Sequence, residues 1–123
     1  MSGEPDWFGA HASDDFCYLT TSGRRTGKPH TIEIWFVVEG ASVYMLAEGG
    51  ERADWVRNIR QNSAVLLRLG EQTRPAIGRI VDDRVEADPI RQLLVAKYQE
   101  WRPDQPVPEW AVQAVVVAVA LPG

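Results

Sequence analysis

Apolar and polar side chains alternate along several short segments of this chain, and glycine, proline or charged residues separate those segments. The clearest alternation lies within residues 30–38, where Ile32, Ile34 and Phe36 fall on one face and Trp35 falls on the other. A period of two residues is typical of a β-strand with one buried face, and Phe36 is therefore expected in the core. Similar patterns predict further strands over residues 16–21, 42–47, 64–69, 73–81 and 112–121.

Two other segments have apolar side chains at helical spacing. Residues 52–61 carry them three or four positions apart, which predicts a short helix. A longer helix is predicted from Pro89 to Trp101, because Asp88 suits the N-cap position and proline suits the first helical position after it.

About six strands and two or three helices, without a repeat or a linker, predict a single domain over residues 1–123. Mostly antiparallel strands joined by short turns, with the helices at one side, favour an α+β barrel. The first 15 residues are expected to be irregular or to form a short helix. Trp7 and Phe8 are the strong apolar residues there, and they either pack on the barrel or cover a site.

Composition narrows the class of partner. The chain is 45% hydrophobic and 24% charged, which is ordinary for a soluble domain, and no apolar run is long enough to span a membrane. The acidic first residues do not resemble a signal peptide and Cys17 is the only cysteine, so we expect a cytoplasmic protein with Cys17 buried. A net charge of −4 argues against general nucleic-acid binding. No set of histidines and cysteines has metal-ligand spacing, which argues against metal chemistry.

A turn rich in glycine, hydroxyls and cations joins the first two predicted strands, from Thr20 to His30. Glycine allows left-handed backbone that exposes N–H groups, and arginine can hold a phosphate with two parallel hydrogen bonds. Such a basic turn on an acidic protein suits an anionic small molecule. Its spacing is neither that of a P-loop nor that of a Rossmann turn. The alternative is a surface hairpin whose cations only keep it soluble. The candidate binding residues are Ser22, Gly23, Arg24, Arg25, Thr26, Gly27, Lys28 and His30.

A second motif runs from Gly49 to Asn58. Gly49 and Gly50 end a strand, and Trp55 and Asn58 are three residues apart on one face of the predicted helix. Arg52 would lie in the first turn of that helix, where the helix dipole disfavours a cation, and this suggests an anionic ligand nearby. The alternatives are a solvated Arg52 and a Trp55 that anchors the core.

Together the two motifs resemble those of the flavin and deazaflavin oxidoreductase family, in the branch of the F420-dependent nitroreductases. Members of that branch have T-T-S/T-G-R-x-T/S-G-x-P-R/H, an aromatic pair in the next strand, and G-G-x-K/R-x-x-W-x-x-N. These correspond here to residues 20–30, to Trp35-Phe36 and to residues 49–58. The resemblance implies a split β-barrel that binds the deazaflavin F420, or FMN in some relatives.

The resemblance also implies an activity. An F420H2-dependent reductase of this kind transfers a hydride from reduced deazaflavin to an electron-poor small molecule such as a quinone, an activated alkene or a nitroaromatic. Two alternatives stay open, namely a non-catalytic carrier of F420, a flavin or a lipid, and an FMN-binding oxidoreductase of the same fold. A homodimer is expected.

By resemblance, the cations and hydroxyls of the first motif hold the phosphate and tail of F420, and Trp35 flanks its ring system. Gly49, Gly50, Arg52, Trp55 and Asn58 are expected to close the other side.

Two residues depart from the family pattern. His30 stands where many members have arginine, and Glu33 stands where many have proline. Glu33 either orients the substrate or donates a proton, or is simply solvated. Tyr18, Tyr44 and Tyr98 are further candidates for a proton donor.

Overall fold

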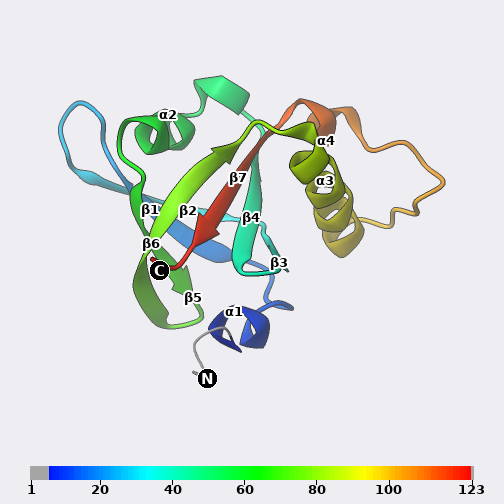
Figure 1. The fold of residues 1–123 in the computed structure, drawn as a ribbon, viewed down its shortest axis with the longest axis horizontal. Helices are drawn as coiled ribbons and strands as arrows, with labels where there is room; N and C mark the ends of the chain where they lie inside the picture. The colour runs from blue at the N-terminus through cyan, green and yellow to red at the C-terminus, as the bar shows by residue number, and fades with distance from the viewer. Residues whose placement is uncertain (1–5, 123) are drawn as a thin grey trace.

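The computed structural model describes residues 6–122, which form one curled antiparallel sheet of seven strands with a few helices around it (Figure 1). The strands follow the order β2-β1-β5-β6-β7-β4-β3. Their bounds are β1 (Cys17–Ser22), β2 (Pro29–Ile34), β3 (Val37–Glu39), β4 (Ser42–Ala47), β5 (Ala64–Leu69), β6 (Gln72–Val81) and β7 (Val115–Ala120). The α+β class and the antiparallel pairing expected from the sequence are confirmed.

The helices lie at different sides of the sheet (Figure 1), and so the expectation that they would group at one side is wrong. They are α1 (Asp6–Ala10), the 3-10 helix η1 (Gly50–Arg52), α2 (Asp54–Gln61), α3 (Arg84–Tyr98) and α4 (Glu109–Gln113). Helix α2 lies beside the β1–β2 hairpin, whereas α3 and α4 lie together at the opposite side of the sheet (Figure 1). Over residues 6–122, every helix is too short or too polar to cross a membrane.

The sheet has apolar side chains on both faces, and they form two clusters. Inside the curl, Phe36, Met45 and Val117 pack with the buried Cys17, and Trp7 and Phe8 of α1 belong to the same cluster. On the other face of β4 and β7, Tyr44, Leu46 and Val116 pack against α3. The prediction for Phe36 is confirmed, and the open question about the N-terminal aromatic pair is decided in favour of packing.

The strand predicted over residues 30–38 is in fact two strands. β2 pairs with β1 and β3 pairs with β4, so this one segment supplies both edges of the sheet. The Tyr98 hydroxyl accepts a hydrogen bond from the Phe36 N–H at 3.1 Å and donates to the Phe36 carbonyl, also at 3.1 Å. Lys97 Nζ donates to the same carbonyl at 2.8 Å. Side chains of α3 thus replace the ladder bonds that the break removes.

The longer helix begins earlier than the sequence predicted. α3 starts at Arg84, because the Asp83 carboxylate accepts a hydrogen bond from the Val85 N–H at 2.9 Å and caps it. Asp88 and Pro89 therefore lie inside α3, not at its start, and the helix ends at Tyr98 before reaching Trp101. Pro89 has no backbone N–H, so α3 lacks one of its internal hydrogen bonds. The packing of the helix against the rest of the protein compensates for that loss.

The predictions for residues 52–61 and 112–121 also need correction. Residues 50–52 form η1 and α2 begins only at Asp54. Residues 109–113 form α4, so β7 is shorter than predicted and starts at Val115.

Candidate functional site

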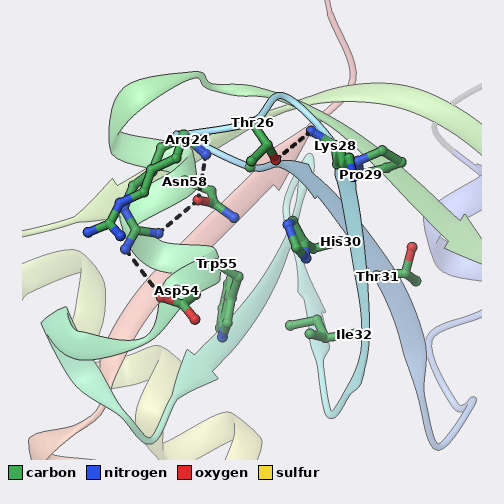
Figure 2. A pocket seen from close by; sticks show the side chains of 12 residues that line it. Arg24, Thr26, Lys28, Pro29, His30, Thr31, Ile32, Asp54, Trp55 and Asn58 are labelled. Carbon is green, nitrogen blue, oxygen red and sulfur yellow. Dashed lines mark hydrogen bonds and ion pairs between the residues drawn. The ribbon is translucent and has the colours of Figure 1, made fainter.

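A groove of about 800 Å³ lies between the β1–β2 hairpin and α2. Figure 2 shows Trp55 and Asn58 on the helix side and His30 and Ile32 on the strand side. The groove therefore joins the two sequence motifs, which are separated by two further strands along the chain. Its lining residues are Gly23, Arg24, Arg25, Thr26, Lys28, Pro29, His30, Thr31, Ile32, Asp54, Trp55 and Asn58.

The hairpin loop holds its own shape. The Gly23 N–H donates to the Lys28 carbonyl and the Gly27 N–H donates to the Gly23 carbonyl, both at 2.8 Å. The Thr26 hydroxyl accepts from the Lys28 N–H at 3.2 Å, and Gly27 has a φ of 76°, which favours glycine. A Cβ on Gly23 would lie 2.9 Å from His30 Nε2, so glycine is what lets the His30 ring lie against the loop.

Asn58 ties the loop to the helix. Its side chain is only 2% exposed. Its Oδ1 accepts from the backbone N–H and from Nη1 of Arg24, each at 3.1 Å, and its Nδ2 donates to the buried Thr21 hydroxyl at 3.0 Å. Arg24 Nη2 also lies 3.3 Å from Asp54 Oδ1 (Figure 2). Asn58 and Arg24 therefore hold the two walls of the groove together in addition to lining it.

The other cations of the groove have no such partners among the described residues. Within residues 6–122, the side chains of Arg25 and Lys28 make neither a hydrogen bond nor an ion pair, and neither does the His30 ring; all three are exposed. The charge of Arg25 and Lys28 is therefore available to a bound anion. Arginine and lysine are the usual partners of phosphate and carboxylate groups.

Several candidate residues lie outside the groove. Ser22 and Gly27 belong to the hairpin but do not line it, and Gly49, Gly50 and Arg52 precede α2. The dipole argument for Arg52 is wrong, because Arg52 ends η1 and the first turn of α2 carries the acidic Asp54 instead.

Trp35 also lies elsewhere, in a second cavity of about 230 Å³. Its ring stacks on the Tyr98 ring with centroids 4.4 Å apart and an interplanar angle of 4°. The opposite orientations predicted for Trp35 and Phe36 are confirmed, but the structure does not bring Trp35 to the loop of cations. The second cavity is lined by Phe16, Glu33, Ile34, Trp35, Leu46, Glu48, Leu94 and Trp110.

Some lining residues were not expected from the sequence. Asp54, Pro29 and Thr31 were not named as candidates, and Ile32 was assigned only to the same strand face as Phe36, whereas it is half-buried and lines the groove. The alternation along β2 placed Ile32 on the core face correctly, but it could not show that this face opens at the hairpin end.

The three candidate tyrosines each have a hydrogen-bond partner. Tyr18 donates to Glu33 at 2.6 Å across the β1–β2 pair, and this bond is the main reason that its pKa is raised. Tyr44 donates to Glu86 at 2.8 Å, and burial, followed by that bond, raises its pKa. Burial raises the pKa of Tyr98 to about 12. A tyrosine is already protonated at neutral pH, and these upward pKa shifts move all three phenols further from ionisation.

A family model described as F420H(2)-dependent quinone reductase matches residues 8–119. The chain belongs to this family. The family resemblance expected from the two motifs is thereby confirmed, and both motifs lie within the matched residues of this F420H2-dependent quinone reductase family member.

Solved structures support the fold. A structure of an F420H2-dependent reductase (FDR-A) is 23% identical with a TM-score of 0.64, covering 87% of this chain and 94% of that one. A conserved hypothetical protein from Mycobacterium tuberculosis is 18% identical with a TM-score of 0.78, covering 100% of this chain and 82% of that one. A structure described as a domain-swapped dimer is 21% identical with a TM-score of 0.66, covering 87% and 80%. The expected split β-barrel is confirmed.

Proposed function

We propose that this protein is an F420H2-dependent reductase that transfers a hydride from reduced deazaflavin to an electron-poor small molecule, namely a quinone, an activated alkene or a nitroaromatic. The observation that carries the proposal is the groove between the β1–β2 hairpin and α2, taken together with membership of the family. Its volume of about 800 Å³ is within the usual range of small-molecule sites.

The donors of this groove fit an anionic cofactor. Arg25 and Lys28 bring positive charge that no described residue neutralises, and Thr26 adds a hydroxyl. These residues would hold the phosphodiester and the acidic tail of F420. Trp55 lines the same groove and offers an aromatic surface to the rest of the cofactor. When bound, reduced F420 supplies the hydride, and the protein supplies the binding site and its electrostatics.

Asn58 and Arg24 have a different role in this proposal. They fix the loop on the helix, so that the free cations lie at one side of the groove before any ligand binds. A site formed in advance lowers the entropic cost of binding.

A carrier of F420 or a flavin would use the same groove without turnover, and an FMN-dependent enzyme would bind FMN more tightly than F420. Both are outcomes of the experiment below.

The test is a titration of the purified protein with F420 and, separately, with FMN, followed by cofactor fluorescence. F420 is expected to bind at micromolar concentration or tighter, and FMN weakly. Reduction of menadione, cyclohexenone and nitrofurazone by F420H2 is then measured. Tighter binding of FMN would contradict the choice of cofactor, and binding without reduction of any acceptor would favour the carrier.

A double variant locates the site. Arg25→Ala with Lys28→Ala is expected to weaken F420 binding at least tenfold while leaving the unfolding midpoint unchanged, because both side chains are exposed and unpaired in the described structure. The control is Arg84→Ala with Arg102→Ala, which removes the same charge from α3 and the loop after it. Equal affinity in the two double variants would overturn the anion site.

We also propose a homodimer, an expectation from the sequence that the related domain-swapped dimer favours. Light scattering after size-exclusion chromatography tests it, and a monomeric mass at micromolar concentration would contradict it.

A further inference from the structure

The second cavity has a different chemistry from the groove. Three aromatic side chains line it, Phe16, Trp35 and Trp110, together with the carboxylates of Glu33 and Glu48. No lysine or arginine is among its lining residues. Its volume of about 230 Å³ is below that of most drug-sized sites, so it suits one functional group and not a whole cofactor.

Contacts with neighbouring groups hold the two tryptophans of this cavity in place. Trp35 stacks on Tyr98, whose hydroxyl is fixed by the Phe36 backbone and by the Asp15 carbonyl at 2.8 Å. Trp110 meets Trp35 at an angle of 68° with ring centroids 6.3 Å apart. Both tryptophans line the cavity, and aromatic rings are the groups by which proteins recognise quaternary ammonium ions.

The carboxylates decide the sign of the charge that the cavity accepts. Within the part of the chain that the structure describes, Glu48 has neither a hydrogen bond nor an ion pair. Among residues 6–122, Glu33 accepts a hydrogen bond from the Tyr18 hydroxyl alone, which is a neutral donor, and the carboxylate forms no ion pair there. Aromatic faces and uncompensated carboxylates both favour a cation, whereas either one alone would leave the ligand class open.

We propose that this cavity binds the ammonium group of a small organic cation. The proposal concerns a site separate from the groove of Arg25 and Lys28, and it requires no cofactor. If the protein is the reductase proposed above, a cationic group on the electron-poor acceptor is the natural ligand of the cavity.

The experiment uses the chain of 123 residues without F420. Choline is the probe, and 3,3-dimethylbutanol is the matched control, because it has the same shape without the charge. Indole N–H signals of Trp35 and Trp110 are followed by nuclear magnetic resonance at constant ionic strength, and each is assigned by a Trp→Phe variant. Choline is expected to shift both signals saturably, with little change from the neutral alcohol.

Charge variants complete the test. Glu33→Gln with Glu48→Gln is expected to weaken choline binding at least tenfold, since both residues are exposed and the amide keeps their size. Glu39→Gln with Glu71→Gln, at exposed positions outside the cavity, is expected to leave it unchanged. Equal shifts from choline and the alcohol, absence of any shift, or unchanged affinity in the cavity variant would each overturn the proposal. None of these outcomes depends on whether F420 binds to the groove.

Discussion

Asn58 Oδ1 accepts two hydrogen bonds from Arg24, one from its backbone N–H and one from Nη1, both at 3.1 Å. The first fixes the backbone of the hairpin loop and the second fixes the direction of the arginine side chain. A single buried amide thus links α2 to a loop that lies 34 positions away in the sequence. The groove depends on this link because its two walls come from these two elements.

Replacing Asn58 with alanine should therefore affect both stability and binding. The Thr21 hydroxyl and the Arg24 backbone N–H would lose their partner in a buried place, which typically costs about 1–3 kcal/mol of the free energy of unfolding. Urea denaturation measures that loss, and fluorescence titration should show weaker F420 binding. Gln61→Ala, at an exposed position of the same helix, is the control. Unchanged F420 affinity in Asn58→Ala would show that the groove does not need the link.

Gly23 offers a second test of the loop. A Cβ at this position would lie 2.9 Å from His30 Nε2 and 3.1 Å from the Lys28 carbonyl oxygen. Gly23→Ala should push the exposed His30 ring away and crowd the Lys28 carbonyl oxygen, and so destabilise the protein by about 1 kcal/mol. The control is Gly9→Ala, where a Cβ would have nothing within 4 Å. Thermal unfolding distinguishes the two variants, and similar midpoints would contradict the close contact.

His30→Arg should strengthen F420 binding. His30 lines the groove beside Lys28, and arginine would add a permanent positive charge there. One added exposed charge contact is worth about 1 kcal/mol or less, so the affinity should rise by up to about fivefold at low salt. The gain should shrink in 0.5 M NaCl because salt screens exposed charges. Gln92→Arg on α3 adds the same charge outside the groove. An equal gain in that control would mean that net charge, and not the groove, steers the cofactor.

Stability at low pH should depend on Glu86. Arg79 donates two hydrogen bonds to this carboxylate, at 3.0 and 2.7 Å, and Tyr44 donates a third at 2.8 Å. The arginine bonds, followed by that of the tyrosine, lower the pKa of Glu86 below its usual 4.5. The stabilisation is therefore fully present above pH 4.5 and is lost as the pH falls through the lower pKa of the folded state.

Glu86→Gln should accordingly lower the free energy of unfolding at pH 7, by about 1 kcal/mol, and should lower it much less at pH 2. Urea denaturation at the two pH values measures both effects. Glu39→Gln, an exposed residue without a partner among residues 6–122, should show no such pH dependence. A loss at pH 2 as large as that at pH 7 would rule out the ionised pair as the source.

Much of the fold could be predicted from the sequence. The bounds of β4 and β5 agree with their predicted ranges, and the alternation in residues 30–38 assigned Phe36 and Trp35 to opposite faces correctly. Local periodicity reports which side of a strand is apolar. It does not show that the segment 30–38 pairs first with β1 at one edge of the sheet and then with β4 at the other. The break between these two strands is stabilised by Tyr98 and Lys97, which are some 60 residues away in the sequence.

The candidate site was likewise predictable from the sequence in part. The family and most of the groove's lining were recognisable in the sequence, since the hairpin cations and the Trp-x-x-Asn spacing are local features. The tertiary structure was needed to show that Arg24 is bound to Asn58, whereas Arg25 is free within residues 6–122 to meet a ligand. It also decided that Trp35 belongs to a second, acidic cavity. Neighbouring cations look alike in a sequence, and they are distinguished only by the partners that distant segments bring to them.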